Sequence, residues 1–586
     1  MTEIEVWAPH AAHVDLDLDN TVIPMAPANR PGWHAVTLPV PPDGYAFRLD
    51  GGPPRPDPRS RRQPNGVHAQ SALDAESATF PWTDASWRGR PLQAATIYEL
   101  HIGTFTPAGT FEAAMEKLDH LVALGIDFVE IMPVAAFNGD HGWGYDGVAL
   151  WAVHEPYGGP EGLRRFVDAC HARGLGVLLD VVYNHLGPSG NYLAEFGPYF
   201  NDAHVTPWGP AVNLDGPGSD EVRAFVIENA LFWLTEHHID GLRLDAVHAL
   251  ADTRAVHLLE ELSEAVDALA ARTGRHLHLI AETDRNDPRT VTERQAGGQG
   301  VHAQWSDDFH HALHSALTGE RQGYYCDFGA VSTIAKVLTS AYFHNGTYST
   351  FRARHHGRPV DTSRLDAARF VVSLQTHDQV GNRAQGDRIG ATLSPGLRKV
   401  GAALLLTSPF TPQLFMGEEW NAGTPWQYFT SHPEPDLAAA VRKGRRAEFA
   451  AYGWSADDVP DPQDPATRTR SRLDWQELDQ APHADLLAWY RALIALRRAE
   501  PALTDPDFAH VSALYDDPAR WLLIRRGPLR VAANLSPEPR TVPVTAAEIL
   551  LTSSPETQLH EDTVTLPPES VAVLSTDARK IAASRR

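Results

Sequence analysis

From about residue 95 onward, short apolar runs alternate eight times with segments of helical periodicity. Strands separated by helices are typical of parallel βα units, because a parallel connection needs a long crossover. Eight such units predict an α/β fold, a closed (β/α)₈ TIM barrel, in which reacting groups lie at the C-terminal ends of the strands. The predicted strands are residues 96–101, 128–132, 176–182, 241–244, 278–281, 303–305, 370–374 and 413–416.

The helices predicted between these strands carry apolar residues spaced by three and four. One series is Val256, Leu259, Leu262, Val266 and Leu269. Another helix is expected after Ser219, which we predict as its N-cap, with Asp220 and Glu221 in the first turn. A helix over residues 486–498 is predicted to close the barrel.

Two stretches with strand periodicity flank the barrel pattern. Residues 1–92 alternate with period two, which predicts an N-terminal β-sandwich of immunoglobulin-like, carbohydrate-binding-module-like type. Residues 93–500 are predicted to form the catalytic barrel, with a lid excursion over about 186–218 that is rich in Gly, Pro and aromatic residues. Residues 501–586 alternate again and predict a C-terminal β-sandwich.

The composition of the chain argues against several classes of partner. The formal net charge of −24 speaks against nucleic acid, because nucleic-acid binders carry a basic surface that neutralises phosphates. Only Cys170 and Cys326 are present, which fits a reducing compartment without a disulfide framework. The acidic N-terminus shows no secretion signal, and no window approaches the length of a membrane span. We therefore expect a cytoplasmic protein with no membrane partner.

Three carboxylates follow predicted strands of the barrel. Asp245 follows the strand at 241–244, Glu282 follows the strand at 278–281, and Asp378 comes shortly after the strand at 370–374. Cleaving a glycosidic bond with retained configuration needs one carboxylate as nucleophile and one carboxylic acid as proton donor, about 5 Å apart. A third carboxylate can bind the ring hydroxyls. The pattern therefore predicts a glycosidase with these three residues as its catalytic groups.

Local context assigns a role to two of these carboxylates. Residues i and i+2 share a strand face, so Arg243 points the same way as Asp245 and keeps that carboxylate ionised. An isolated Arg-x-Asp would more often be a structural ion pair. The apolar run before Glu282 is expected to raise the pKa of its carboxyl, as suits a general acid. The alternative for Glu282 is a strand-terminal residue that faces solvent.

Further polar and aromatic residues lie at the same predicted strand ends. Taken singly, a histidine such as His185 is more often buried and hydrogen-bonded, and a tyrosine such as Tyr145 more often packs in the core. In this ring of strand ends we expect both to contact sugar. The residues predicted to bind substrate are Tyr145, His185, Arg243, His248, Asp307, Asp308, His311, His377, Gln379 and Asn382.

Other chemistries find little support in the chain. His310, His311 and His314 are a weak signal for a metal, because no second cluster supplies the converging ligands that zinc needs. We find no phosphate-binding Gly-rich loop with its Lys, no Gly-x-Ser-x-Gly elbow and no His-Glu-x-x-His helix. We therefore expect neither a metal nor a cofactor.

Several of these segments resemble the α-amylase superfamily of glycoside hydrolases and transglycosylases. The four ordered regions are similar to residues 180–185, 241–245, Glu282 and 377–378, and residues 414–419 are similar to the eighth-strand segment. The resemblance covers essentially the whole barrel. It implies Asp245 as nucleophile, Glu282 as acid/base and Asp378 as the residue that stabilises the transition state.

Within that superfamily the chain looks most like the malto-oligosyltrehalose trehalohydrolases. The supporting stretches are residues 56–60, 63–68, 281–286, 305–311 and 377–383. The resemblance implies an oligosaccharide substrate, hydrolysis of the α-1,4 bond next to a terminal trehalose, and a pathway link to malto-oligosyltrehalose synthase. We expect a monomer. Thr283 departs from the family, which commonly has an acidic residue there. His248–Ala249 and Thr376 stand where many amylases carry Lys-His and Asn.

Two rival functions remain open at this point. A glycogen-branching enzyme would keep the same three carboxylates but pass the glycosyl group to a sugar hydroxyl. A non-catalytic glycan-binding protein could share the fold, although all three carboxylates are intact.

Overall fold

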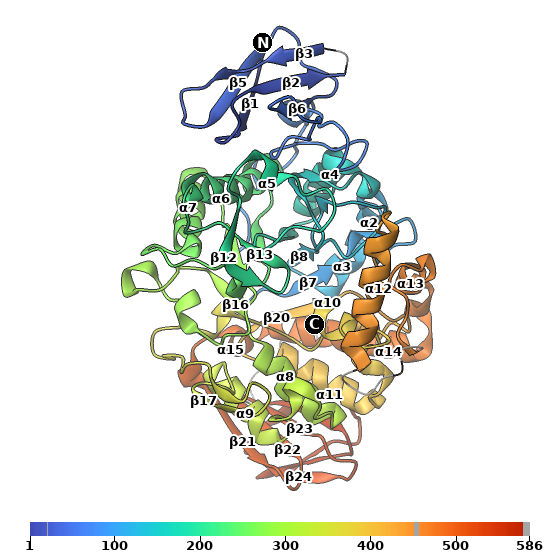
Figure 1. Cartoon of the computed structure of the whole chain (residues 1–586). Helices are drawn as coiled ribbons and strands as arrows, with labels where there is room; N and C mark the ends of the chain where they lie inside the picture. Colours follow the sequence, from blue (N-terminus) through green and yellow to red (C-terminus); the bar gives the residue numbers. More distant parts are fainter. Residues whose placement is uncertain (20, 451–454, 456–457, 578–586) are drawn as a thin grey trace.

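The structure is a computed structural model that describes residues 1–19, 21–450, 455 and 458–577. Three parts follow one another along the long axis of the molecule in Figure 1. The N-terminal strands lie at one end, the barrel fills the middle, and the C-terminal sheets lie at the other end. This order matches the order of the parts along the sequence.

The middle part is a closed barrel of eight parallel strands, which confirms the predicted fold class. Neighbours around the barrel are β11, β14, β15, β16, β19, β20, β7 and β8. All eight predicted strands are present to within two residues at either end. Their bounds are β7 Ile97–Leu100, β8 Phe128–Ile131, β11 Gly176–Val181, β14 Gly241–Leu244, β15 His278–Ala281, β16 Ala303–Trp305, β19 Phe370–Ser373 and β20 Thr411–Phe415.

Two layers of side chains fill the barrel interior. The first layer is an apolar cluster that includes Ile97, Phe128, Leu178, Ile280, Ala303 and Val371. Side chains two residues further along a strand point the same way, and here they are polar. This second layer contains Glu99, Glu130, Asp180, Arg243 and Gln413, all of them buried. A charged layer therefore lies directly beneath the C-terminal rim of the barrel.

Helices surround the barrel, and one of them closes it as predicted. Helix α14 (Ala481–Ala499) covers the predicted segment 486–498. The others include α2 Phe111–Met115, α3 Leu118–Leu124, α4 Gly159–Ala172, α6 Ser219–Glu236, α7 Leu258–Thr273, α8 Asp307–Thr318, α9 Val331–Ser340, α11 Pro395–Leu406 and α12 Pro435–Ala450.

Two details of the helix predictions were wrong. Ser219 is the first helical residue of α6, and the N-cap is Gly218 with φ of 77°. A left-handed N-cap favours glycine, so the cap lies one residue earlier than the side-chain rule suggested. Val256 lies before α7 and is 43% exposed, whereas Leu259 and Leu262 of the same series are buried.

The excursion after the third barrel strand has structure of its own. It contains α5 (Leu193–Phe196) and an antiparallel hairpin of β12 (Phe200–Thr206) and β13 (Gly209–Val212). Trp208 lies at the tip of this hairpin, and its ring stacks on that of His185 with 4.5 Å between centroids. The hairpin therefore covers the C-terminal end of β11.

The N-terminal part consists of two three-stranded antiparallel sheets. Their strands are β1 Thr2–Trp7, β5 Trp33–Leu38 and β4 Ala26–Pro27 in one, and β3 Thr21–Pro24, β2 Val14–Leu18 and β6 Ala46–Leu49 in the other. The connection to the barrel carries three arginines that form ion pairs with barrel glutamates. The pairs are Arg59–Glu228, Arg61–Glu236 and Arg62–Glu155.

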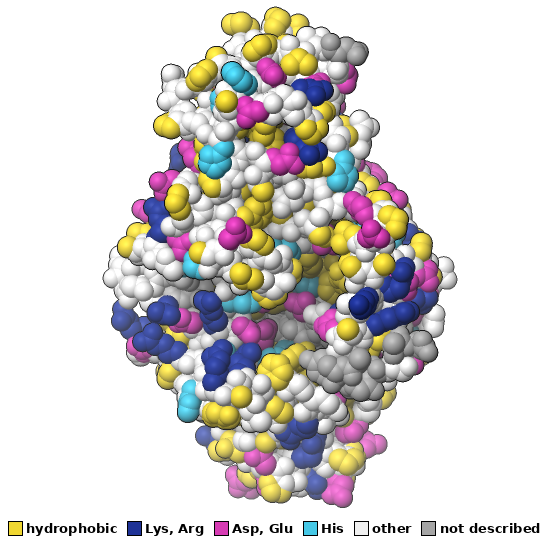
Figure 2. Space-filling view, viewed as in Figure 1, with side chains coloured by type: hydrophobic (Ala, Val, Ile, Leu, Met, Phe, Trp, Pro, Cys, Tyr) yellow, Lys and Arg dark blue, Asp and Glu magenta, His cyan; other side chains and the backbone are white. Residues whose placement is uncertain are grey.

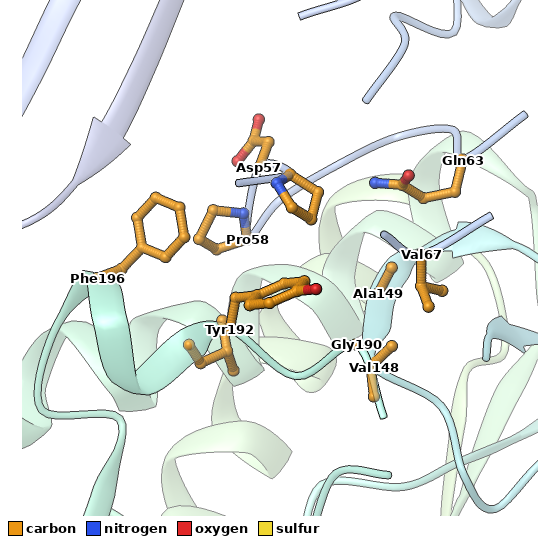
Figure 3. Close-up of a pocket in the computed structure, with 11 residues that line it drawn as sticks. Asp57, Pro58, Gln63, Val67, Val148, Ala149, Gly190, Tyr192 and Phe196 are labelled. Carbon is orange, nitrogen blue, oxygen red and sulfur yellow. The ribbon is translucent and has the colours of Figure 1, made fainter. Parts of the chain in front are cut away.

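A small cavity lies between this connection and α5. Figure 3 shows Tyr192 and Phe196 beside Pro58 of the connection, with Asp57 above them. The cavity has a volume of about 20 Å³, which is room for roughly one water and no sugar ring. The Asp57 carboxylate accepts a hydrogen bond of 2.7 Å from the Tyr45 hydroxyl. This cavity is therefore a small packing defect between the connection and α5, not a ligand site.

The C-terminal part is a sandwich of two antiparallel sheets. One sheet contains β21 Val511–Asp516, β22 Trp521–Arg526, β23 Leu529–Asn534, β28 Ser570–Ser575 and β25 Glu548–Thr552, and the other β24 Arg540–Pro543, β27 Thr563–Leu566 and β26 Gln558–Leu559. Buried side chains from both sheets, such as Leu523 and Val564, form one cluster. No helix among the described residues combines the length and apolar character needed to cross a bilayer.

Candidate active site

Asp245 and Glu282 lie at equal height on adjacent strands. Leu244 pairs in register with Ala281, and each carboxylate residue comes next along its own strand. The side chain of Arg243 contacts both of them. Its Nη1 donates to Asp245 Oδ1 at 2.7 Å, and its Nη2 is 3.7 Å from Glu282 Oε2. One guanidinium therefore holds the two predicted reacting carboxyl groups side by side.

Arg243 lies in the charged layer beneath the rim of the barrel and also contacts Asp180. Its Nη1 also donates to both oxygens of Asp180, at 3.0 and 2.9 Å. Burial alone would lower the pKa of Arg243, but Asp180, Asp245 and Glu282 keep it above the ordinary value. Its side chain is completely buried, and the contacts that the structure shows for it position carboxylates. Its contact with substrate stays a prediction.

Asp245 has donors on both of its carboxylate oxygens. The second donor is Asn184, whose Nδ2 bonds to Asp245 Oδ2 at 2.8 Å and to its carbonyl at 3.0 Å. Hydrogen bonds from a cationic and a neutral donor fix the orientation of this carboxylate. Its side chain is still 12% exposed, which leaves one edge open to a ligand.

Glu282 is in a different electrostatic environment. Burial raises the pKa of its carboxyl well above the ordinary value, and the nearby carboxylates of Asp245 and Asp378 raise it further. The backbone amide of Ala246 donates to Glu282 Oε2 at 2.5 Å. Ala246 has a left-handed backbone with φ of 39°, a conformation that costs non-glycine residues about 1 kcal/mol or more. The charge of Arg243 opposes burial but does not outweigh it, so the surroundings of Glu282 favour the protonated carboxyl that a general acid requires.

Asp378 lies in the first turn of α10 (His377–Gly381). Its side chain is 42% exposed, and Asn382 Nδ2 donates to its Oδ1 at 3.1 Å. Its neighbour His377 is buried, and His377 Nε2 lies 2.8 Å from the Tyr145 hydroxyl. Burial would lower the pKa of His377, but the charges of Glu99 and Asp378 and the hydrogen bond to Glu99 together outweigh burial and raise it to about 9. His377 is therefore an imidazolium at neutral pH.

Tyr145 connects this histidine to the charged layer. Its hydroxyl donates to Asp180 Oδ2 at 2.6 Å, and its ring stacks on His377 with 5.1 Å between centroids. Burial raises the pKa of Asp180 to about 6. The network thus runs from Glu99 through His377, Tyr145 and Asp180 to Arg243.

An open cavity of about 210 Å³ lies beside these groups. Figure 2 shows a hollow across the middle of the visible face, with acidic and histidine side chains inside it. The residues that line the cavity are Glu282, Asp284, Trp305, Asp307, His311, Tyr324, Phe351, Arg352, Asp378, Gln379 and Asn382. Two predicted catalytic carboxyl groups therefore share one cavity with four predicted binding residues: Asp307, His311, Gln379 and Asn382.

Asp307 and Asp308 are neighbours with opposite surroundings. Asp307 lines the cavity, and burial raises the pKa of its carboxyl to about 6. Asp308 Oδ2 instead accepts hydrogen bonds of 2.8 Å from Asn286 Nδ2 and from the amides of residues 343 and 344. The two side chains differ because both residues begin α8 and successive helix positions point in different directions. The contact of Asp308 with substrate stays a prediction.

Two predicted histidines lie at the margin of the site. His185 has protein partners on both ring nitrogens, the Asn184 side chain and the Tyr145 carbonyl, and Trp208 covers one face of its ring. His248 is half-buried, and its Nδ1 has no hydrogen-bond partner among the described residues. Its contact with substrate stays a prediction.

Sequence reasoning missed several residues of the site. Glu99 and Glu130 are acidic residues within apolar strands, and that interruption was the available signal. Burial raises the pKa of Glu130 well above its ordinary value. Asp284, Tyr324, Phe351 and Arg352 come from connections between elements, where no periodicity marks a position. Arg352 Nη2 donates to Asp284 Oδ2 at 2.7 Å.

The histidine cluster on α8 is used structurally. His310 Nε2 is 2.8 Å from the Tyr325 hydroxyl, and His314 Nε2 is 2.9 Å from Glu320 Oε2. Within the described part of the chain, no group of three or more His, Cys, Asp or Glu is arranged to hold a metal ion.

Comparison with family models places the barrel and the C-terminal part. Residues 71–202 match the model described as alpha amylase, catalytic domain. Residues 506–573 match a domain of unknown function, DUF3459.

Close relatives cover nearly the whole chain. A malto-oligosyltrehalose trehalohydrolase from Mycobacterium tuberculosis is 54% identical over 98% of this chain and 99% of its own. One from Arthrobacter ramosus is 56% identical over 92% of this chain and 93% of its own. A 1,4-alpha-glucan branching enzyme from Bacillus caldolyticus is 31% identical over 52% of this chain and 51% of its own.

Solved structures repeat the architecture. A crystal structure from Salmonella typhimurium, assigned as an alpha amylase, has a TM-score of 0.90 and 37% identity, covering 98% of this chain and 97% of that one. A pullulanase from Paenibacillus barengoltzii with maltotriose has a TM-score of 0.72 and 19% identity, over 98% and 94% of the two chains. The second likeness concerns the fold alone.

Proposed function

The chain belongs to the malto-oligosyltrehalose trehalohydrolases of the α-amylase superfamily, and we propose that it hydrolyses the α-1,4 bond next to the terminal trehalose of malto-oligosyl trehalose. The products are trehalose and a malto-oligosaccharide. One observation carries the chemistry: Arg243 holds Asp245 and Glu282 side by side at the rim of the barrel. The likeness to full-length trehalohydrolases supports the choice of substrate.

The proposed reaction proceeds in two steps with retained configuration. In the first, Glu282 donates its proton to the glycosidic oxygen that leaves with trehalose, while Asp245 attacks the anomeric carbon and forms a glycosyl ester. In the second, the Glu282 carboxylate takes a proton from water, whose oxygen attacks the same carbon and displaces Asp245. Glu282 ends protonated and Asp245 ionised, as they began. The raised pKa of Glu282 supports its part in both steps.

The remaining polar groups are proposed to bind the sugar that reacts. Asp378 accepts hydrogen bonds from ring hydroxyls, and the imidazolium of His377 adds positive charge close to Asp378, 3.5 Å from its Oδ1. The flat face of Tyr145 supports the ring. The carboxylates Asp245 and Asp378 face the positive charge that develops at the anomeric carbon, which is the arrangement that electrostatic catalysis needs.

The cavity beside Glu282 is proposed to receive the leaving disaccharide. A proton donor must face the leaving oxygen, so the space beyond Glu282 is where that sugar lies. Two aromatic rings, Tyr324 and Phe351, line this space with 6.1 Å between their centroids. Trehalose is uncharged, and aromatic faces together with hydrogen-bonding groups such as Gln379 suit it.

We further propose a cytoplasmic monomer that acts on the product of malto-oligosyltrehalose synthase. Cys170 and Cys326 are both free thiols in the structure, which fits a reducing compartment. The three parts are proposed to correspond to residues 1–92, 93–500 and 501–586, the first of carbohydrate-binding-module-like type.

A product analysis tests the proposed function. Purified protein incubated with maltotriosyl trehalose should release trehalose and maltotriose, whereas Asp245→Ala should release neither. Equal or faster cleavage of maltopentaose would overturn the assignment. A branching enzyme would shift the iodine spectrum of amylose without releasing reducing sugar, and a non-catalytic binder would show no difference between the wild type and Asp245→Ala.

A further inference from the structure

A bidentate ion pair lies behind the cavity and joins two of its walls. Arg383 Nη1 donates to Glu320 Oε2 at 2.9 Å, and Nη2 donates to Oε1 at 3.0 Å. Glu320 follows α8, and Arg383 follows α10. Neither residue lines the cavity. The pair therefore connects the segment after α8 to the segment after α10 without itself lining the cavity.

Neighbouring groups hold this pair in one geometry. His314 Nε2 is 2.9 Å from Glu320 Oε2, and Arg383 Nε donates to Asp387 Oδ2 at 2.9 Å. The hydrogen bonds from His314 and Arg383, with the charge of Arg383, outweigh burial and lower the pKa of Glu320 to about 2. The two side chains are 26% and 23% exposed, so water screens them only in part. Bidentate arginine–carboxylate contacts are among the strongest and most directional.

Each partner lies within four residues of a residue that lines the cavity. Asn382 directly precedes Arg383, and Tyr324 follows Glu320 by four residues, within η6 (Gly323–Tyr325). The Tyr324 ring also packs on His311, with 4.7 Å between centroids. The ion pair thus ties the backbone that carries Tyr324 to the backbone that carries Asn382.

We propose that Glu320 and Arg383 are positioning residues that set the separation of the Tyr324 and Asn382 walls, and so select trehalose as the leaving group. This inference rests on the proposed function, because the cavity lies on the side of the proton donor Glu282. A fixed separation lets the walls contact both rings of a compact disaccharide. If the separation of the walls could vary, the site would accept the end of an ordinary glucan chain as readily as trehalose.

The nucleophile and His377 have anchors of their own. Arg243 and Asn184 donate to the Asp245 carboxylate at 2.7 and 2.8 Å, and Glu99 holds His377. Loss of the ion pair should therefore widen the cavity and leave the chemistry at Asp245 in place. This separation of effects makes the proposal testable.

The test compares two substrates on Glu320→Gln, which keeps the size of the side chain and removes its charge. Maltotriosyl trehalose needs the cavity, whereas α-maltotriosyl fluoride does not, because fluoride leaves without occupying a sugar site. We expect kcat/KM to fall about tenfold on the first substrate, mainly through KM, and to stay within about twofold on the second. Trehalose, added as an inhibitor of fluoride hydrolysis, should bind about tenfold more weakly.

A matched control is available in the same chain. Glu155 forms a similar two-contact pair with Arg62, at 2.7 and 3.4 Å, on the seam with the N-terminal part. Glu155→Gln should leave both substrates and trehalose inhibition unchanged. In a double-variant cycle, Glu320→Gln should add little to the loss caused by Arg383→Gln, because the two residues act as one unit.

The outcomes separate this inference from the proposed function. A parallel loss on both substrates would overturn the inference, because the pair would then support the catalytic groups or the fold as a whole. Unchanged trehalose inhibition in Glu320→Gln would overturn it as well. Failure of the wild type to release trehalose would instead overturn the proposed function, whatever the variants do.

Discussion

Glu99 accepts two hydrogen bonds from one residue, His377. Glu99 Oε2 accepts from the backbone amide of His377 at 3.0 Å, and Oε1 is 2.5 Å from its Nδ1. Glu99 is on β7 and His377 follows β19, with β20 between them in the barrel. Both side chains are buried. Orientation and charge of His377 therefore depend on a carboxylate two strands away.

Replacing Glu99 by Gln should change the pH dependence of stability. The pKa of His377 is raised to about 9 from 6.5. The stability that its protonated form contributes to the fold is therefore complete below pH 6.5 and is lost as pH rises through about 9. The linkage is on the order of 3 kcal/mol. We expect the free energy of unfolding of the wild type to decline over that window and that of Glu99→Gln to be lower and flatter, as urea titrations at successive pH values would measure.

Glu130→Gln is the matched control for that experiment. Burial raises the pKa of Glu130 and so favours its neutral form, and we expect the Gln variant to behave like the wild type. Activity gives a second readout: the alkaline limb of the pH profile of Glu99→Gln should move to lower pH. An unmoved limb would show that Glu99 does not set the charge of His377.

Replacing Glu282 by Gln should remove the proton donor and leave the nucleophile. We expect kcat on maltotriosyl trehalose to fall by about 10²- to 10⁴-fold. The first step on α-maltotriosyl fluoride should be much less affected, since fluoride leaves without protonation, and a glycosyl ester should accumulate. Mass spectrometry would detect the ester, and added azide should restore turnover. Equal losses in the first step on both substrates would refute the assigned role.

Replacing Asp307 by Asn should stabilise the protein while weakening substrate binding. The folded protein holds the pKa of Asp307 at about 6, above 3.8, so ionisation of this residue destabilises the fold as pH rises from about 4 through 6. At pH 7.5 the free energy of unfolding of the variant should exceed that of the wild type by on the order of 2 kcal/mol, and at pH 5 by about half of that. Thermal unfolding at both pH values, together with KM, checks this. A variant less stable than the wild type would contradict it.

The adjacent substitution, Asp308→Ala, should have the opposite effect. It leaves three buried N–H donors, on Asn286 and residues 343 and 344, without their acceptor. We expect the free energy of unfolding to fall by about 2 to 4 kcal/mol, with KM changed less than about threefold. Denaturant titration measures the stability and steady-state kinetics measure KM. A large rise in KM at unchanged stability would indicate instead that Asp308 binds substrate.

The barrel was predictable because its signal is repeated. Eight apolar runs at strand length, separated by helical spacing, left little choice of architecture. The side-by-side position of Asp245 and Glu282 follows from the parallel register of Leu244 and Ala281. Residues that end adjacent strands of a closed barrel must meet.

What the sequence did not reveal depends on distant contacts. The burial of Arg243 follows from the carboxylates packed around it, and a strand-end arginine looks the same whether it is buried or open. Asp307 and Asp308 are identical in type and adjacent in sequence, and only the turn at residues 343–344 tells them apart. Tyr324 and Phe351 lie between elements, where no period marks which side chain faces a cavity.

The arginines between the N-terminal sheets and the barrel bear on how this chain could be shortened. Arg59, Arg61 and Arg62 neutralise glutamates on α6 and beside α4. A protein begun at residue 93 would expose three uncompensated acidic groups and uncover the ring of Trp151, over which two of these arginines lie. The first ninety residues thus cover part of the barrel surface, and we expect a chain shortened to the barrel to be less stable than the whole protein.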